Sequence, residues 1–345
     1  MEYRKLGRTG LEVSAIGLGT EHLEPSGEVR GDVLRTAVEA GVNYVDLLYV
    51  EPEYWADFGP VLRPYREKLV LAAHWGSGPC FELDYCQRTF DNILSCVGND
   101  YVEVAMMTMV DEEDRWNGWL HESLEHLRRY QEQGRVGYVG GSAHDTSMAV
   151  KAVKSGLLDV LMFPVNIVGH SDEKNDELYQ ACVDEGVGLV AMKPYHGGTL
   201  LSVGGQPSGI TPAQCLAYVL SLPVSTAVPG PKNGEELRAT LHYLEATEGE
   251  KDFGPVVANL YDYLRGQCVY CHHCLPCPEE IQIGWLIWIV DYARHGVTDD
   301  LRGWYASHAA KASDCTGCGI CLERCPFDVD ILAKMQEAVE IFESD

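Results

Sequence analysis

Basic residues are scarce in this chain: 26 Lys and Arg stand against 52 Asp and Glu, which gives a formal net charge of −26. A field of that sign repels the phosphates of nucleic acids and the anionic surfaces of membranes. The shortage of cations therefore excludes nucleic acid and membrane surfaces as expected partners.

Long apolar runs are absent as well. The most apolar stretch, IQIGWLIWIV at 281–290, is far shorter than the roughly 20 residues that a helix needs to cross a bilayer. Residues 1–8 are charged and lack the apolar core of a secretory signal, so we expect a cytoplasmic protein. With 46% hydrophobic and 23% charged residues in 345, the composition predicts a folded chain with a sizeable core and two domains.

The chain up to about residue 250 alternates short apolar runs with stretches of helical periodicity. In 116–133, for example, Trp116, Leu120 and Leu124 recur at intervals of four. Eight such units predict an α/β fold, a closed (β/α)₈ TIM barrel over residues 1–254. An open doubly wound sheet is the alternative, although no G-x-G-x-x-G follows the first run. The eight apolar runs are 14–20, 44–48, 69–75, 102–108, 137–142, 160–166, 188–194 and 225–230.

Polar residues gather where these runs end. In a barrel of this class the chemistry lies where the carboxyl ends of the strands meet the following loops, so their side chains are expected to converge. The alternative is that each one only satisfies the backbone of its own loop. The residues at the run ends are Glu21, His22, Asp46, Tyr49, His74, Thr108, Ser142, His144, Asn166 and Lys193.

Eight of the 13 cysteines fall into two runs. The first reads C-x2-C-x2-C-x2-C-P over 268–278, and the second reads C-x2-C-x2-C-x3-C-P over 315–326. In two-cluster ferredoxins such runs bind four-iron clusters, and the fourth cysteine of a run ligates the other cluster. We therefore predict two 4Fe–4S clusters, one on Cys268, Cys271, Cys274 and Cys325, the other on Cys315, Cys318, Cys321 and Cys277.

Zinc is the alternative ligand for these runs, but a third cysteine three residues on has no use at a tetrahedral zinc. The segment between the runs has helical spacing, with Trp285, Ile289 and Tyr292 on one face. Residues 255–345 are therefore predicted to form a small α-helical ferredoxin-like domain. The remaining cysteines are scattered in helical segments and are expected to be buried structural thiols.

Several segments carry a family likeness over nearly the whole chain. YRKLGRTGLEVSAIGLGT (3–20), GVNYVD (41–46), GRVGYVGGSAHD (134–145), GVGLVAMKPYHGGTLL (186–201) and STAVPG (225–230) resemble the aldo-keto reductases. The chain is most similar to the subgroup that ends in a ferredoxin-like module with two 4Fe–4S clusters. The resemblance implies a TIM-barrel oxidoreductase that acts on a small molecule.

The resemblance also implies an Asp, Tyr, Lys, His tetrad, of which only Asp46 has a match. Glu51 stands at the position of the Tyr, His74 at that of the Lys and Thr108 at that of the His. The usual proton relay is therefore broken. Substitutes are available: His74 paired with Asp46 could donate a proton, and Glu51, Tyr49 or Tyr54 could act as the acid.

The family's grip on the nicotinamide cofactor is altered too. In GPKNGEELRATL (230–241), the family's basic and Arg…Glu-Asn positions carry Glu236, Ala239 and Thr240. A carboxylate repels the adenosine phosphate, so we expect NADPH binding to be lost, although Lys232 and Arg238 lie nearby. The resemblance places Ser142, Asn166 and Lys193 around the nicotinamide, or around a substrate in its place. The other residues expected in this substrate or cofactor pocket are His22, Tyr54, His144, Gly230 and Lys232.

Three functions are consistent with these patterns. The first is an iron–sulfur oxidoreductase whose barrel binds a small substrate and whose clusters relay electrons, with a redox partner protein as the possible donor. The second is an NADPH-dependent carbonyl reductase or alcohol dehydrogenase. The third is a non-catalytic electron carrier. A divalent metal on His22, Asp46, Glu51 and His74 is a further hypothesis, resting on ligand types alone.

Overall fold

A computed structural model describes residues 1–48, 52–76, 81–111, 113–171, 173–203, 206–294 and 296–344. Tyr49 and Glu51, both predicted site residues, lie outside these ranges. The chain divides into two compact units, one of residues 1–201 and 209–254, the other of residues 202–208 and 255–345.

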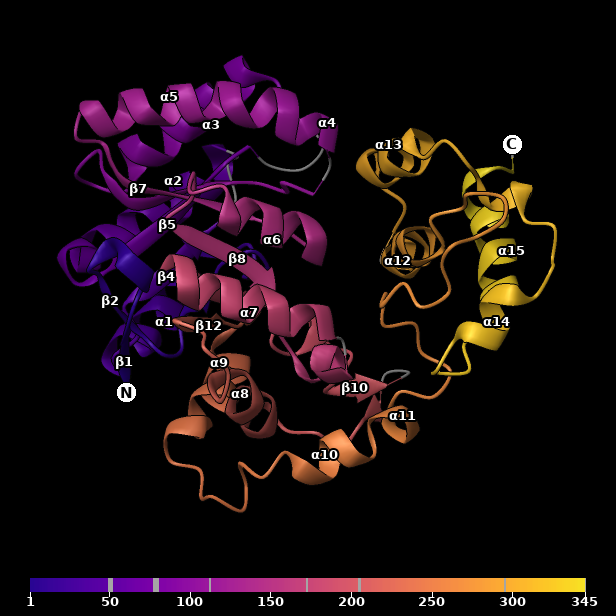
Figure 1. Ribbon diagram of the computed structural model, residues 1–345. Helices are drawn as coiled ribbons and strands as arrows, with labels where there is room; N and C mark the ends of the chain where they lie inside the picture. The colour runs from indigo at the N-terminus through magenta and orange to yellow at the C-terminus, as the bar shows by residue number, and fades with distance from the viewer. Residues whose placement is uncertain are drawn as a thin grey trace. The chain divides into compact units, whose positions relative to one another are not determined.

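The first unit is built on an eight-stranded parallel sheet in which consecutive strands along the chain are neighbours (Figure 1). A parallel bridge between Ile16 and Ala227 joins the first and last strands, with the Gly17 amide donating to the Ala227 carbonyl at 2.8 Å, so the sheet closes into a barrel. Each of the eight predicted runs contains one strand. The strands are β3 (Leu18–Gly19), β4 (Tyr44–Leu47), β5 (Val70–Trp75), β6 (Val102–Met107), β7 (Val136–Ser142), β8 (Val160–Pro164), β9 (Gly188–Met192) and β12 (Thr226–Val228).

Apolar side chains from these strands fill the inside of the barrel. Tyr44, Val104, Met106, Val160 and Val190 are fully buried members of one hydrophobic cluster. Their strands are buried on both faces, which is why they read as continuous apolar runs in the sequence instead of alternating ones. The barrel interior is therefore a packed core, and its polar chemistry is confined to the strand ends.

Helices follow the strands and cover the outside of the barrel (Figure 1). Local signals set their starts: Thr211 and Gln214 form a capping box ahead of α8, with Pro212 in its first turn. The predicted helix at 116–133 begins differently, as a π-helical turn over Trp116–Leu120 that continues into α5. The helices are α1 (Gly27–Glu39), α2 (Pro52–Leu62), α3 (Leu83–Cys96), α4 (Glu113–Arg115), α5 (His121–Glu132), α6 (Thr146–Lys154), α7 (Glu173–Glu185), α8 (Pro212–Leu220) and α9 (Gly234–Leu241).

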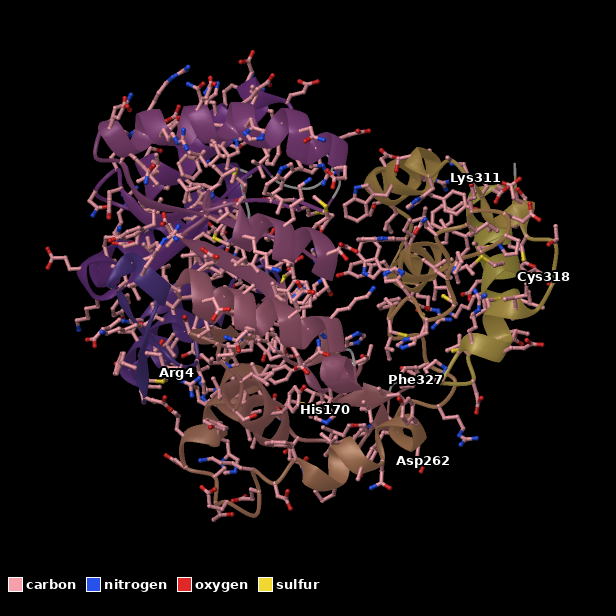
Figure 2. The ribbon with its side chains drawn as sticks, in the orientation of Figure 1. Arg4, His170, Asp262, Lys311, Cys318 and Phe327 are labelled. Carbon is pink, nitrogen blue, oxygen red and sulfur yellow. The ribbon has the colours of Figure 1, made fainter. Side chains whose placement is uncertain are left out.

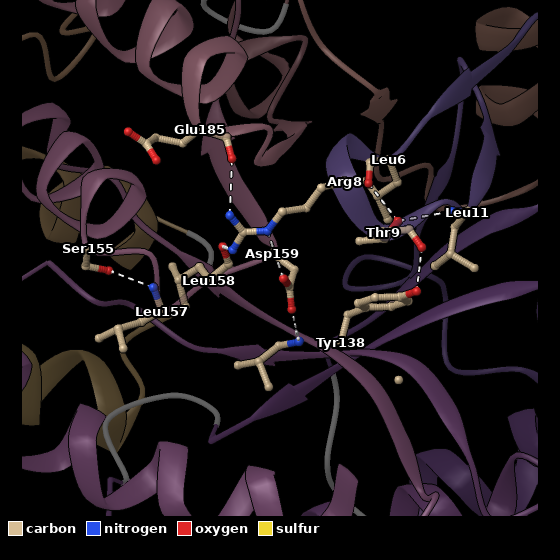
Figure 3. Close-up of polar contacts among 12 residues, drawn as sticks. Leu6, Arg8, Thr9, Leu11, Tyr138, Ser155, Leu157, Leu158, Asp159 and Glu185 are labelled. Atoms are coloured by element: carbon tan, nitrogen blue, oxygen red, sulfur yellow. Dashed lines mark hydrogen bonds and ion pairs between the residues drawn. The ribbon is translucent and has the colours of Figure 1, made fainter.

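An N-terminal hairpin closes the end of the barrel where the strands begin. Its strands are β1 (Tyr3–Lys5) and β2 (Glu12–Ser14), and Leu6 between them is fully buried. Figure 3 shows the polar contacts of its turn: Arg8 bonds to the Asp159 carboxylate at 3.2 Å, and the Tyr138 hydroxyl donates to the Thr9 carbonyl at 2.5 Å. This hairpin covers the end of the barrel opposite the rim at which the strands end.

The second unit consists of short helices around the two cysteine runs. Buried residues of α12 and α15, including Ile287 and Met335, form its apolar centre. Lys311, labelled in Figure 2, donates to the carbonyls of Tyr305 and Ala306 at the end of α13. Its elements are β10 (Ser202–Val203), β11 (Gln206–Pro207), α10 (Gly254–Ala258), α11 (Leu260–Tyr263), α12 (Ile283–Ala293), α13 (Asp299–Ser307), α14 (Ile320–Arg324) and α15 (Ile331–Phe342).

Within the described ranges, the helices are too short or too polar to cross a membrane. The apolar run that stood out in the sequence falls largely in α12, which is 11 residues long and buried by its neighbours in the second unit. Its apolar side chains therefore form part of the small hydrophobic core of the second unit.

The hairpin turn predicts a large cost for one added methyl group. Gly7 has φ +52°, and a Cβ there would lie 2.2 Å from the Gly188 amide nitrogen of β9. Because the clash is with backbone, we expect Gly7→Ala to lower the free energy of unfolding by about 1–3 kcal/mol beyond the cost of the left-handed backbone. Gly134→Ala is the matched control, since Gly134 has φ +71° but open space around it. Equal losses of stability in urea unfolding would contradict the role given to this contact.

Candidate functional site

The ends of three neighbouring strands bring Asp46, His74 and Thr108 together. Asp46 lies in β4 and His74 in β5, and the His74 Nε2 is 3.1 Å from the Asp46 Oδ1. The His74 Nδ1 is 3.0 Å from the hydroxyl of Thr108, which directly follows β6. All three side chains are buried, with residue exposures of 7%, 3% and 5%. The predicted convergence of these residues at the barrel rim is present.

The hydrogen bonds assign the protons of this group. Thr108 donates its hydroxyl proton to the Gly76 carbonyl at 2.7 Å, so its oxygen accepts from His74 Nδ1–H. The other ring nitrogen of His74 faces the carboxylate of Asp46, which accepts when ionised. Both ring nitrogens of His74 are therefore in hydrogen-bond contact with protein side chains. His74 thus links three strand ends, and neither nitrogen can reach a substrate without leaving a protein partner.

Tyr54, which the sequence offers as an alternative acid, is also hydrogen-bonded to the protein. Tyr54 is 7% exposed, and its hydroxyl donates to the Thr20 carbonyl at 3.4 Å. The Arg30 guanidinium lies over its ring, 4.2 Å from the centroid. Tyr54 is therefore held against the end of β3 in this conformation, and Tyr49 and Glu51 lie outside the described residues.

A second polar group lies at the ends of β6, β7 and β9. His144 Nδ1 is 3.2 Å from the Asp111 Oδ2, and Lys193 Nζ is 3.1 Å from the His144 Nε2. The other carboxylate oxygen of Asp111 accepts the backbone amides of His144 and Asp145. Because Nδ1–H donates to the carboxylate, Nε2 is left to accept from the Lys193 ammonium. Three side chains from three loops thus form one chain of hydrogen bonds.

The electrostatics of this second group follow from its crowding. Burial and the nearby Lys193 lower the pKa of His144, so its ring is neutral near pH 7. Burial opposes ionisation of Asp111, but hydrogen bonds from the His144 ring and two amides outweigh it and lower the pKa of the carboxyl. Desolvation lowers the pKa of Lys193, while Glu21 and Asp111 act in the opposite direction. Since Lys193 is exposed as a whole residue, we expect its lowering to be modest.

Two further predicted pocket residues serve the loop backbone. The Ser142 hydroxyl accepts the Met109 amide at 2.9 Å. The Asn166 amide group donates to the Lys193 carbonyl at 3.1 Å, and its oxygen accepts the Val168 amide at 3.1 Å. For Ser142 and Asn166, the alternative of loop support describes the observed contacts. Asn166 thereby also holds the backbone of Lys193, which has φ +53°.

The resemblance implies that a nicotinamide cofactor binds at the start of α9. In this structure, backbone amides there donate to side chains of the same segment. The Asn233 side chain accepts the amides of Glu235 and Glu236 at 3.1 and 3.2 Å, and the Glu236 carboxylate accepts the Lys232 amide at 2.7 Å. Arg238 pairs with Asp32 at 3.1 Å. These contacts leave a negative charge where an anionic ligand would meet the helix end.

The other two residues of the predicted pocket lie next to each other. A Cβ added at Gly230 would be 3.3 Å from the His22 ring, and the His22 Nε2 is 3.8 Å from the Glu21 carboxylate. His22 is exposed and stands at the end of β3. Within the described ranges, no three His, Cys, Asp or Glu side chains are placed so that they could hold a single metal ion. That result includes His22, His74 and Asp46.

The eight cysteines line two hollows in the second unit. One is partly open to solvent and is lined by Cys268, Cys271, Cys274 and Cys325. The other is lined by Cys277, Cys315, Cys318 and Cys321, and Cys274 lines both. Apolar side chains, among them Ile283 and Met335, complete the second wall. Each hollow is thus lined by cysteines of both runs: three of the first run with Cys325 in one, and three of the second run with Cys277 and Cys274 in the other.

Asp111 is the site residue that the sequence analysis missed. It lies three residues beyond Thr108 in the acidic stretch DEED, whose composition is typical of a solvated loop. Its position shortly after the end of β6 is the sequence feature that could have indicated a role in the site. The close pairing of Lys193 with His144 was also not predicted.

Comparisons with known proteins agree on one family. A model of the aldo/keto reductase family matches residues 15–214. L-glyceraldehyde 3-phosphate reductase of Escherichia coli is 27% identical over 227 residues, which are 58% of this chain and 63% of that protein, so the chain spans less than two thirds of the relative's length. L-galactose dehydrogenase of Arabidopsis thaliana is 25% identical over 59% of this chain and 68% of its own. The structure of an aldo-keto reductase from Bacillus halodurans in its holo form is similar, with a TM-score of 0.62 and 21% sequence identity. The match covers 74% of this chain and 96% of that one, and it supports the fold.

The His74 contacts predict a specific loss of stability on removing one hydroxyl. Thr108→Val keeps the side-chain shape but leaves the buried His74 Nδ1–H without its acceptor, so we expect the free energy of unfolding to fall by about 1–3 kcal/mol. Thr108→Ser, which keeps the hydroxyl, is the matched control and should lose less. If denaturant unfolding finds the two variants equal, the proton assignment at His74 is wrong.

Proposed function

The chain belongs to the aldo/keto reductase family, and we propose that it is an iron–sulfur oxidoreductase that acts on a small organic substrate at the rim of its barrel. Two four-iron clusters in the second unit would relay the electrons. The observation that carries this proposal is that each of the two hollows is lined by three cysteines of one run together with a cysteine of the other, Cys325 in the first and Cys277 in the second, and that Cys274 lines both. Crossed pairing of that kind is what two-cluster ferredoxins use.

The residues fit such clusters better than they fit zinc. Ligands of one zinc ion must converge on a single point, whereas the four thiolates of a cubane bind four different iron atoms and stand farther apart. The absence of a single-ion site in the described ranges is consistent with the larger group. The predicted ligands of one cluster are Cys268, Cys271, Cys274 and Cys325, and those of the other are Cys277, Cys315, Cys318 and Cys321.

Bound clusters would supply electrons singly, from a redox partner protein, to a substrate in the barrel. The residues of the barrel would provide binding and protons. On one side, Asp46, His74 and Thr108 form a fixed and fully bonded group. On the other, Lys193 presents an exposed ammonium at the rim. A small polar organic molecule is the substrate class that these side chains would suit.

Iron and sulfide content tests this proposal directly. Anaerobically purified full-length protein should be brown and contain about eight iron and eight sulfide per chain, as two cubanes require. About four iron would mean that one cysteine run is structural only. Stoichiometric zinc without sulfide would replace the proposal with a structural zinc module.

The crossed pairing has its own set of variants. Cys277→Ser should disturb the cluster held mainly by the second run, and Cys325→Ser the cluster held mainly by the first, as read by electron paramagnetic resonance of partly reduced samples. Cys96→Ser, at a cysteine of the barrel unit, is the control and should leave both signals unchanged. Effects confined to each variant's own run would contradict crossed ligation.

A second candidate is an NADPH-dependent carbonyl reductase, which the family match and the names of the relatives favour. The contacts at the start of α9 weigh against it. The family's helix end would have to bind a phosphate, and here the Asn233 side chain and the Glu236 carboxylate already occupy the local amides. We therefore rank this function below the first.

Cofactor titration separates the two candidates. We expect the dissociation constant for NADPH to exceed about 1 mM, which is a binding free energy weaker than roughly 4 kcal/mol. The measurement is nicotinamide fluorescence or calorimetry on the full chain. Micromolar binding would favour the reductase, and Lys232→Ala and Arg238→Ala should then weaken it.

A further inference from the structure

The chain of hydrogen bonds from Asp111 through His144 to Lys193 has the form of a catalytic relay. A proton-carrying group lies within hydrogen-bond reach of an imidazole, and the imidazole is held by a carboxylate on its other nitrogen. That order is the one by which enzymes orient and tune a reactive side chain. Its three members come from the ends of three strands, at the barrel rim where chemistry is expected.

The environment fixes Lys193 from several directions. Its backbone carbonyl accepts from Asn166, and its φ of +53° is one that residues other than glycine seldom adopt. Backbone outliers of this kind concentrate at functional sites. The residue is nevertheless exposed, so its ammonium can contact a molecule at the rim while one of its N–H groups donates to the His144 Nε2.

The other described candidates for a proton donor are committed elsewhere. Both ring nitrogens of His74 contact protein acceptors, and the Tyr54 hydroxyl is bonded to Thr20. An ammonium has three protons, so Lys193 retains donors after bonding to His144. Among these three, Lys193 alone combines exposure with an available proton.

We propose that Lys193 is the general acid of the barrel, with His144 and Asp111 as the residues that position it, and that it protonates the oxygen of an aldehyde or ketone as that carbonyl is reduced. This inference rests on the proposed function only in taking the reaction to be the reduction of a small organic substrate. Lys193 would thus do the work that the family gives to the missing tyrosine.

The proton balance is simple. One N–H bond of the Lys193 ammonium breaks and one O–H bond forms on the substrate, leaving a neutral amine that regains its proton from solvent. The carbonyl carbon takes up two electrons and one further proton. With a one-electron iron–sulfur donor, the two electrons come from that donor in successive steps and the proton comes from solvent. With a reduced nicotinamide as donor, the electrons and the proton arrive together as hydride.

The charges that face Lys193 set the direction of its pH dependence. Glu21, Asp111 and the neutral ring of His144 surround its ammonium, and the two carboxylates raise its pKa against the effect of desolvation. A general acid must be protonated, so turnover falls as the pH rises through the pKa of Lys193. Removing either carboxylate charge, in Asp111→Asn or Glu21→Gln, should move that alkaline limb to lower pH.

The test has two parts. In the first, trace acetylation of the full chain across pH, read by peptide mass spectrometry, gives a titration profile for each lysine. Lys193 should titrate below the surface residues Lys151 and Lys154, which are internal controls paired with Glu113 and Glu177. Asp111→Asn and Glu21→Gln should each lower the Lys193 midpoint and leave the controls unchanged. The proposal would be overturned if the titration midpoint of Lys193 equalled those of the two control lysines and did not change in either variant. That outcome would count whether or not a substrate is turned over.

The second part measures reduction of a panel of small aldehydes and ketones, beginning with glyceraldehyde 3-phosphate, by reduced methyl viologen and separately by NADPH. Lys193→Met should lower the rate by about 10²–10⁴-fold. Lys193→Arg keeps the charge but holds its protons too tightly to donate, so it should lose activity to a similar extent. An active Lys193→Arg would overturn the role as an acid. Turnover with NADPH alone would refute the iron–sulfur function and leave the role of Lys193 intact.

Discussion

The polar chemistry of this protein depends on a contact between two backbones at the opposite end of the barrel. Gly7 in the N-terminal hairpin lies so close to Gly188 of β9 that a side chain at Gly7 would meet the amide nitrogen at 2.2 Å. With that end closed and the interior packed by apolar side chains, a substrate can approach only the rim where the strands end. Asp46, His74, Thr108, His144 and Lys193 all lie at that rim.

The rim has two sides with different physical characters. The side formed by β4, β5 and β6 is buried, and each donor and acceptor of His74 and Thr108 has a protein partner. The side formed by β6, β7 and β9 is more open and holds an ammonium beside a neutral imidazole. The first is suited to fixing the strand ends and the second to exchanging protons. One side thus presents the buried, fully bonded imidazole of His74, and the other presents the exposed ammonium of Lys193.

The sequence predicted the barrel well because its strands are parallel and buried on both faces. Such strands appear as short continuous apolar runs, and all eight runs contain a strand. The N-terminal hairpin was missed, since its strands are three residues each and half exposed, too short for a periodic signal. The π-helical turn at Trp116–Leu120 was missed because its side-chain spacing still resembles that of an α-helix.

Prediction of the site succeeded where it depended on strand ends and failed where it depended on loop conformation. Asp46, His74 and Thr108 meet because adjacent parallel strands end side by side, which follows from their order. Asp111 stands in a run of four acidic residues, DEED, and nothing in their order shows which one turns inward. The direction of the loop is set by Met109, with φ +53°, and by the Ser142 hydroxyl that binds its amide, both of which depend on the assembled barrel.

Cysteines of both runs line each hollow of the second unit. Neither run alone supplies four cysteines to either hollow: Cys325 joins three cysteines of the first run, and Cys277 and Cys274 join three of the second. The segment between the runs, which includes α12 and α13, must therefore fold before either hollow is complete. The unit should consequently mature as a single event, and a chain cut between the two runs would lose both hollows together.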